Sequence, residues 1–234
     1  MRRILALLAL IVATVVVFVV WPNFRPVPQI RDRALPVLPD GDAPLIIVAF
    51  GTSLTARGRW PDLLGERLAR CLDRPVEMHT IAKPGAGSDW AIQAVPDVVA
   101  RKPDLVLLEF SMNDADLLDG VSLAASRQRH TTLLKELDKS LPNLRVLLMT
   151  MNPVTGLQRL KRPRLNAYYD IYHTLSETRN TGLADMAPRW AALPAGWSVD
   201  GVHPETGLAE QILPGVLAEM IAAAAGGDCP QHKI

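Results

Sequence analysis

From residue 45 onward, short apolar runs alternate with segments of helical periodicity. The runs are rich in leucine and β-branched residues, which is typical of strands buried on both faces of a parallel sheet. The predicted strands cover residues 45–50, 76–81, 105–110, 146–150 and, with a weaker pattern, 183–186. A (β/α)8 barrel would need eight such units. The alternation therefore predicts an α/β fold, a three-layer α/β/α sandwich with a central parallel sheet of about five strands.

The N-terminus contains a long apolar stretch. Two arginines precede an uncharged run over residues 4–21, close to the roughly 20 residues that a helix needs to cross a bilayer. No small-residue cleavage site follows the run, so residues 1–22 are interpreted as an uncleaved signal anchor, with a cleaved signal peptide as the alternative. The short basic N-terminus predicts that the rest of the chain lies in the periplasm or elsewhere outside the cytoplasm.

Composition and spacing predict the remaining organisation. Residues 23–43 are rich in proline and form an expected linker, residues 44–226 an expected single domain, and residues 227–234 a tail. The formal net charge is +1 and the charges are scattered, which argues against nucleic acid as a partner. Neither cysteine belongs to a C-x-x-C pair; Cys71 is expected in the core, with a bridge to Cys229 as the alternative in an oxidising compartment.

Polar residues lie where the predicted strands end. Ser53, Gly85 and Asn113 follow the first three strands, and Asp200 and His203 share a turn before the last helix. Because open parallel sheets bind ligands at the carboxyl ends of their strands, these residues are expected at one edge. Taken singly, each is also typical of a turn or a helix cap. Together they indicate acyl transfer, in which a histidine activates a serine and N–H groups bind the oxyanion.

The same residues resemble those of the SGNH or GDSL hydrolases. Four motif blocks occur in order between residues 45 and 217, namely "GTSLT", "KPGAG", "SMND" and "DGVH". The resemblance implies a flavodoxin-like sandwich in which Ser53 is the nucleophile, His203 the base and Asp200 its partner. It also implies an oxyanion hole built from the Ser53 and Gly85 N–H groups and the Asn113 amide. Neither a metal nor an organic cofactor is implied.

Three positions depart from the family pattern. Thr52 stands where the family has aspartate, Ser111 where it has glycine, and "KP" where it often has Asn-Ala before the glycine. None of them removes a group that carries the chemistry. Asp114 is expected to bind loop N–H groups, and the other histidines lack metal-ligand spacing and are interpreted as surface or core residues.

These observations lead to one functional hypothesis and several alternatives. The chain is expected to be a membrane-anchored serine esterase that works through an acyl-enzyme and removes O-acetyl groups from envelope or extracellular polysaccharide. The alternatives are a lysophospholipase or thioesterase for longer acyl chains, a sugar O-acyltransferase, and a catalytically silent, anchored binding domain. The expected partners are a small-molecule, lipid or carbohydrate ester and, through the N-terminal helix, the membrane.

Overall fold

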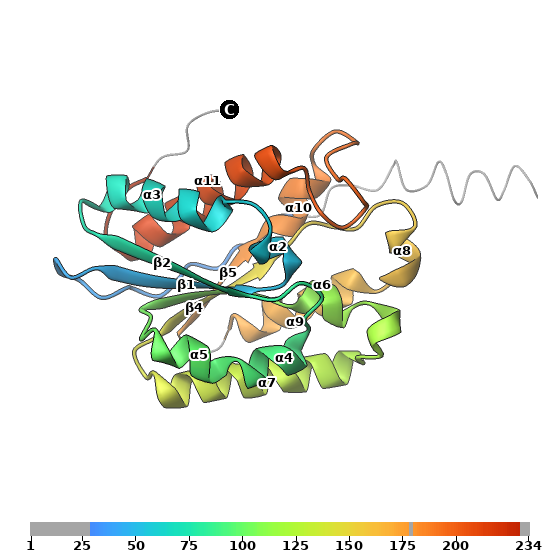
Figure 1. The fold of residues 1–234 in the computed structure, drawn as a ribbon, viewed down its shortest axis with the longest axis horizontal. Coiled ribbons are helices and arrows are strands. Elements are labelled where there is room, and N and C mark those ends of the chain that lie inside the picture. The colour runs from blue at the N-terminus through green and yellow to red at the C-terminus, as the bar shows by residue number, and fades with distance from the viewer. Residues whose placement is uncertain (1–28, 178–179, 230–234) are drawn as a thin grey trace, which may run out of the picture.

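The computed structural model describes residues 29–177 and 180–229 (Figure 1). Five parallel strands form one sheet in the order β2-β1-β3-β4-β5. Their bounds are β1 (Leu45–Gly51), β2 (Val76–Ala82), β3 (Leu105–Glu109), β4 (Arg145–Thr150) and β5 (Thr181–Asp185). The predicted five-stranded parallel sheet is thus confirmed, whereas the anchor predicted over residues 1–22 lies outside the described residues.

Helices cover both faces of the sheet. The longer ones are α3 (Trp60–Leu72), α7 (Leu123–Ser140), α9 (Leu165–Leu175) and α11 (Thr206–Ala224). The shorter ones are α2 (Ser53–Ala56), α4 (Ser88–Gln93), α5 (Val95–Ala100), α6 (Ser111–Asp114), the 3-10 helix η3 (Leu117–Asp119), α8 (Gln158–Lys161) and α10 (Met186–Ala191). Figure 1 shows α3, α10 and α11 on one face and α4, α5, α7 and α9 on the other, which confirms the three layers.

Burial of the strands matches their place in the sheet. Every residue of β3 and β5 is buried, and nearly every residue of β1 and β4. The edge strand β2 is partly exposed along its length, as expected where one side has no neighbouring strand. The other edge strand, β5, is buried because the chain around Arg33 pairs with its free side. Leucine, isoleucine and valine fill the space between the sheet and its helices, so most of the folding free energy comes from this apolar burial.

The helix α11 is apolar enough and long enough to cross a membrane by composition alone. Half of its most apolar stretch is buried inside the domain, and its fully buried Leu217 and Ile221 belong to the same core as Leu64 and Leu68 of α3. We therefore interpret α11 as a core helix of the sandwich.

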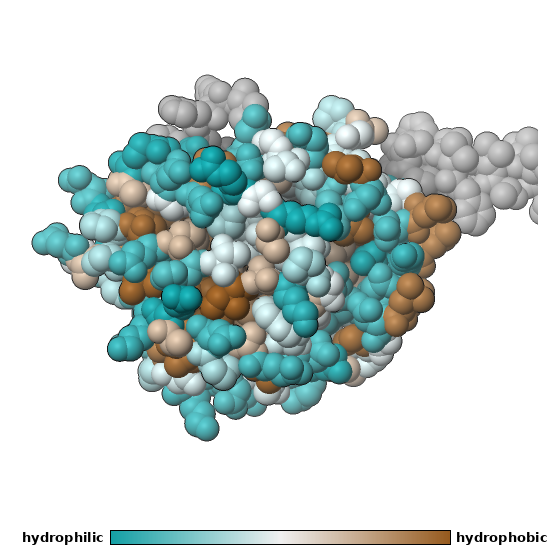
Figure 2. Space-filling model, in the orientation of Figure 1, coloured by the Kyte–Doolittle hydropathy of each residue, from teal (hydrophilic) through white to brown (hydrophobic). Residues whose placement is uncertain are grey.

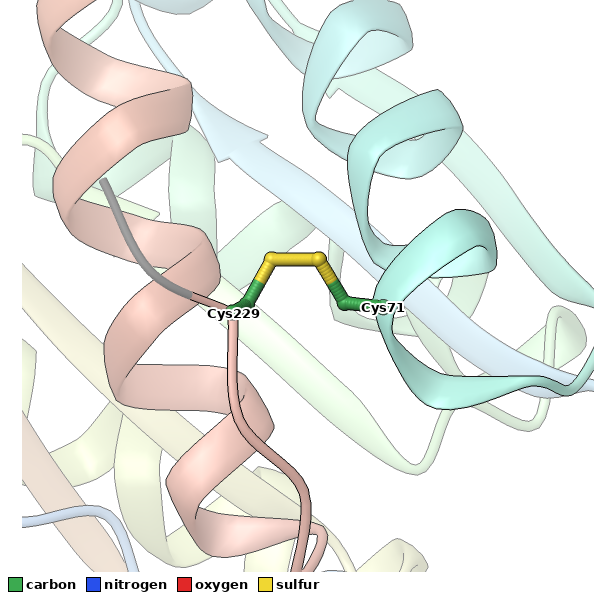
Figure 3. The surroundings of a disulfide bond; sticks show 2 residues. All are labelled: Cys71 and Cys229. Carbon is green, nitrogen blue, oxygen red and sulfur yellow. A yellow bond between two sulfur atoms is a disulfide. The ribbon is translucent and has the colours of Figure 1, made fainter. Parts of the chain in front are cut away.

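A disulfide joins Cys71 in the last turn of α3 to Cys229 in the segment after α11 (Figure 3). The bridge fastens two segments that are 158 residues apart in the sequence. The sequence left this pairing as an alternative to a free core cysteine, and the structure contains the pair.

The described part of the predicted linker lies along β5. Arg33 and Leu183 exchange two backbone hydrogen bonds of 3.0 Å in an antiparallel bridge, and Leu35 and Leu38 are buried against the domain. Gly182 permits this approach, since a Cβ there would come within 2.9 Å of the backbone of Leu35. Residues 29–43 therefore form a strap on the domain.

The strap has a defined direction. Because the bridge to β5 is antiparallel, the residues before Arg33 lie toward the carboxyl end of that strand. There the Arg31 N–H donates to the Asp185 carboxylate at 3.0 Å, and the Asp185 N–H donates to Asp32 at 2.8 Å. The chain consequently joins the domain at the edge of the sheet where the strands end.

Candidate active site

The first candidate residue, Ser53, lies in a tight connection between β1 and α2. Thr52 caps α2, because its Oγ1 accepts the Leu54 N–H at 3.2 Å, and Ser53 is the first helical residue. The indole N–H of Trp60 donates to the Leu54 carbonyl at 2.9 Å and fastens the turn to α3. These contacts hold a nearly buried serine at the end of a central strand.

Ser53, His203 and Asp200 form a continuous hydrogen-bonded chain. The Ser53 Oγ lies 2.8 Å from His203 Nε2, and His203 Nδ1 lies 2.7 Å from an Asp200 carboxylate oxygen. Since a carboxylate only accepts, Nδ1 carries the proton and Nε2 is free to accept the serine proton. The structure thus brings Ser53 into contact with a turn that lies 147 or more positions later in the sequence. The serine, histidine and carboxylate follow one another in the order that nucleophilic catalysis needs.

Asp200 is held in its ionised form. Its partial burial favours the neutral acid, but hydrogen bonds from the His203 N–H, the His203 ring and the Val202 N–H outweigh that effect and lower the pKa of Asp200 to about 2. The carboxylate is therefore charged at every pH at which the protein is expected to act. An ionised partner stabilises the imidazolium that forms when His203 takes a proton.

The turn that carries Asp200 and His203 is fastened to the loop after β4. The Thr155 N–H donates to the Gly201 carbonyl at 2.8 Å, and the Asn152 side chain donates to the Val202 carbonyl at 2.6 Å. Gly201 has a φ of +86°, which non-glycine residues rarely adopt. These constraints fix the histidine ring relative to Ser53.

The predicted oxyanion donors lie on two neighbouring loops. Gly85 has a φ of +76° in a turn closed by the Ala86 N–H on the Lys83 carbonyl, which is typical of a type II turn with proline and glycine at its centre. The Asn113 side chain donates one amide hydrogen to the Ala86 carbonyl at 2.8 Å, which leaves its second hydrogen for another acceptor. The Lys83 N–H donates to the Gly51 carbonyl, so this loop adjoins the Ser53 turn.

Glu109 is a site residue that the sequence analysis missed. It ends β3, is buried, and accepts hydrogen bonds from the Thr52 N–H at 2.6 Å, the Thr52 hydroxyl at 2.9 Å and the Thr55 hydroxyl at 2.7 Å. Burial raises the pKa of Glu109 to about 7, although these hydrogen bonds oppose the shift. A glutamate at the end of the apolar run "LVLLEF" was the available signal.

The contacts of Glu109 also account for two neighbouring residues. A Cβ on Gly51 would collide with the Glu109 carboxylate and the Thr55 hydroxyl, so only glycine fits there. At position 52 a threonine donates its hydroxyl hydrogen to Glu109, whereas the aspartate of the family pattern would bring a second carboxylate to a buried one. Threonine in place of the family's aspartate at position 52 is thus explained by the Glu109 carboxylate, to which it donates a hydrogen bond.

Asp114 binds the loop that precedes α4. One of its carboxylate oxygens accepts the Ser88 N–H at 2.9 Å, as expected from the sequence, and the other accepts the Ser126 hydroxyl at 2.6 Å. Since Asp114 follows Asn113 directly, these bonds fix the α6 segment against both α4 and α7.

A buried histidine supports the same segment. His130 Nδ1 lies 2.9 Å from the Ser126 carbonyl and therefore carries a proton, while Nε2 accepts the Tyr172 hydroxyl hydrogen at 3.0 Å. The Tyr172 oxygen in turn accepts the Phe110 N–H at 2.8 Å. Burial lowers the pKa of His130, so its ring stays neutral and acts in the structure of the loop that carries Asn113.

A cavity of about 210 Å³ opens beside Ser53. It lies between the start of α3 and the turn that carries His203. Its lining includes Leu54, Arg57, Trp60, Val199, Pro204 and Thr206.

Residues 47–206 match the model of the GDSL-like lipase/acylhydrolase family. The chain belongs to this family. The match runs from β1 into the first turn of α11 and includes every candidate site residue. No curated protein matches the chain in a sequence comparison. Membership makes the protein an ester-bond hydrolase of the GDSL/SGNH group.

Solved structures of other hydrolases share the fold. A lipase/acylhydrolase from Enterococcus faecalis superposes with a TM-score of 0.68 at 21% identity, covering 80% of this chain and 99% of its own. Axe2, an acetylxylan esterase from Geobacillus stearothermophilus, gives 0.63 at 19% identity, with 80% and 97% covered. TesA gives 0.61 at 21% identity, with 76% and 99% covered. At these identities the similarity shows that the fold is shared and nothing further.

Proposed function

We propose that the protein is a serine esterase in which Ser53, His203 and Asp200 act as a catalytic triad. The observation that carries the proposal is the continuous chain of 2.8 Å and 2.7 Å contacts from the serine through the histidine to the carboxylate. His203 takes the proton of Ser53 as its Oγ attacks the carbonyl carbon of an ester. The protonated ring then donates this proton to the departing alcohol, which leaves an acyl group on Ser53.

Hydrolysis of this acyl-enzyme follows the same steps with water as the nucleophile. His203 removes a proton from the water, the hydroxide attacks the acyl carbon, and the Ser53 oxygen leaves with the proton from His203. In both halves the negative charge on the carbonyl oxygen would be bound by the Ser53 N–H, the Gly85 N–H and the Asn113 amide. Fixed donors of this kind favour the tetrahedral intermediate over the planar ester.

The substrate we propose is a short-chain ester, an O-acetyl group on a polysaccharide in particular. The cavity beside Ser53 is about 210 Å³, below the roughly 300–1,000 Å³ of sites that enclose larger ligands. A small acyl group fits such a space, while the alcohol part of the ester would point out of the cavity. That one structural neighbour is an acetylxylan esterase is in keeping with this choice.

We also propose that residues 1–22 anchor the domain in a membrane, outside the cytoplasm. The support is the uncharged apolar run over residues 4–21 and the disulfide between Cys71 and Cys229, a bond that persists in oxidising compartments.

The experiment is hydrolysis of p-nitrophenyl esters of increasing chain length by the full chain in non-ionic detergent. We expect turnover of the acetate, a fall with longer chains, and loss of both turnover and fluorophosphonate labelling in Ser53→Ala. The exposed Ser140→Ala is the matched control and should retain both. Preference for long chains would favour the lysophospholipase or thioesterase alternative.

Two other outcomes would change the reaction class. Transfer of the acyl group to a sugar at the expense of hydrolysis would make the protein an O-acyltransferase. Absence of labelling in folded wild-type protein would refute the triad and favour a silent binding domain.

A further inference from the structure

Large apolar side chains are exposed around the candidate active site. Five residues that are each 61–81% exposed lie in the loops beyond the carboxyl ends of the strands. We call them the apolar rim: Leu117 and Leu118 in η3, Leu157 and Leu160 at α8, and Val199 beside Asp200. Figure 2 shows apolar side chains gathered along the edge of the molecule where Figure 1 draws α8. Exposed apolar clusters of this kind mark binding surfaces.

The four leucines of the rim lie on segments that a buried arginine holds in place. Arg162 donates through Nε to the Met112 carbonyl at 3.0 Å, through Nη1 to the Gln158 side chain at 2.8 Å, and pairs through Nη2 with Asp116 at 2.8 Å. It thereby ties α8 to α6 and η3, the segments next to Asn113. The exposure of the leucines is consequently a fixed property of the fold.

Cations are interspersed with the rim. Arg159, Lys161 and Arg164 are exposed on α8 and the turn that follows it, next to Leu160. Exposed carboxylates on this side include Asp119 of η3 and Asp200, which pairs with His203, whereas Asp116 pairs with the buried Arg162. Apolar side chains beside lysine and arginine are typical of surfaces that bind the headgroup region of an anionic bilayer.

The strap begins at the same edge. Gln29, the first described residue, lies toward the carboxyl end of β5, and exposed Ile30 follows it. Seven chain steps separate Gln29 from residue 22, the predicted end of the anchor, so the two lie at most about 25 Å apart. A membrane that holds residues 1–22 would therefore lie close to the rim.

We propose that the apolar rim docks onto the anionic lipid bilayer that holds the chain's own N-terminal segment, so that the Ser53 cavity opens at the membrane surface. The inference rests on the anchor in the proposed function. It deepens that function, because the ester would be met at the membrane surface and not in the surrounding solution.

The test uses full-length protein in vesicles of phosphatidylglycerol and phosphatidylethanolamine. Both native cysteines are in the disulfide, so Leu157→Cys can be labelled alone with an environment-sensitive fluorophore. The matched control is Val37→Cys, which is also exposed (69%) and lies at the opposite edge, where Arg145 of β4 donates to the Val37 carbonyl. We expect nitroxide-labelled lipids to quench at least roughly half of the emission at position 157 and to leave position 37 unchanged.

A second variant tests the role of charge. In Arg159→Gln with Lys161→Gln, quenching of the 157 probe in anionic vesicles should fall to the level seen in neutral phosphatidylcholine vesicles. Each variant is first shown to hydrolyse p-nitrophenyl acetate in detergent at the rate of the wild-type protein, which establishes that it is folded. Quenching is then compared among these variants.

The outcomes separate this inference from the function on which it rests. Protein that floats with the vesicles while the 157 probe stays unquenched would overturn the docking and leave the anchor standing. Equal quenching at positions 157 and 37, or a blue shift that depends only on protein concentration, would also overturn it. Protein that does not float would refute both the anchor and the docking, whereas the triad is tested separately by hydrolysis in detergent.

Discussion

Replacing Glu109 by glutamine removes a buried ionisable carboxyl group and retains the hydrogen bonds around it. The Glu109 Oε1 accepts the Thr52 N–H and the Thr55 hydroxyl, and a glutamine Oε1 can accept both. The amide nitrogen would occupy the place of Oε2, 3.1 Å from the Thr52 Oγ1, to which it can donate. Glu109→Gln is therefore expected to remove the titration of this carboxyl group without moving the Ser53 turn.

The expected effect on stability depends on pH. Burial raises the pKa of Glu109 from its ordinary value of 4.5 to about 7, so between these pH values the folded chain keeps a proton that the unfolded chain loses. Stability is accordingly retained below about pH 4.5 and falls as the pH rises toward 7. At about 1.4 kcal/mol per pKa unit, the loss amounts to about 3 kcal/mol.

Glutamine does not titrate, so this loss is absent from the variant. Relative to wild type, Glu109→Gln should gain about 3 kcal/mol of unfolding free energy between acidic solution and about pH 8, because contributions of all other groups cancel in the comparison. The measurement is urea unfolding of the full chain in non-ionic detergent, followed by fluorescence of the fully buried Trp60 and Trp190. The exposed Glu136→Gln is the control and should show no such gain.

A constant difference between wild type and Glu109→Gln at both pH values would refute the reasoning. It would mean that the carboxyl of Glu109 titrates near its ordinary value and that the hydrogen bonds from Thr52 and Thr55 compensate its burial completely. A difference that grows in the opposite direction would mean that these bonds outweigh burial.

Three further predictions concern the triad, the oxyanion donors and the disulfide. Asp200→Asn should lower kcat for p-nitrophenyl acetate by roughly three to four orders of magnitude with little change in KM, because the His203 tautomer is no longer fixed; an unchanged kcat would refute the role of Asp200. Asn113→Ala should lower kcat by roughly 10²- to 10³-fold, and a raised KM with unchanged kcat would instead indicate a binding defect. Replacing Cys71 and Cys229 by serine should lower the unfolding free energy by about 2–5 kcal/mol and leave kcat of the folded protein unchanged, which urea unfolding and ester hydrolysis measure in the same samples.

The strands of the sheet could be predicted because their signal is local. Continuous apolar runs gave β1 to β4 with bounds within a few residues of those observed. The prediction for β5 began at residue 183, whereas the strand begins at Thr181, because Thr181 and Gly182 interrupt the apolar pattern. Gly182 is required by the strap on its side of the strand, and that contact joins residues about 150 positions apart, which no local pattern records.

The candidate site likewise contains residues that local motifs predict and residues whose role depends on contacts between distant parts of the sequence. Ser53 could be named because it lies in a short motif at a strand end, and Asp200 and His203 because they share a short motif before the last helix. The structure places the three in hydrogen-bond contact. Glu109 could not, since its importance comes from Thr52 and Thr55, which lie more than 50 residues earlier in the sequence. The tie between Cys71 and Cys229 likewise depends on α3 and α11 being neighbours in space.

The antiparallel direction of the strap has a consequence for the orientation of the whole domain. The sheet has two edge strands, and the strap pairs with β5, where it crosses Leu183 while running toward the amino-terminal ends of the strands. A parallel strap would join the domain at the amino-terminal ends of the strands. For a five-residue strand, that end is about 17 Å farther from the site. That extra distance would take up about two thirds of the roughly 25 Å of chain between Gln29 and the predicted anchor. If residues 1–22 anchor the chain as proposed, the antiparallel pairing of Arg33 with Leu183 leaves the whole of this connecting segment at the edge where the rim lies.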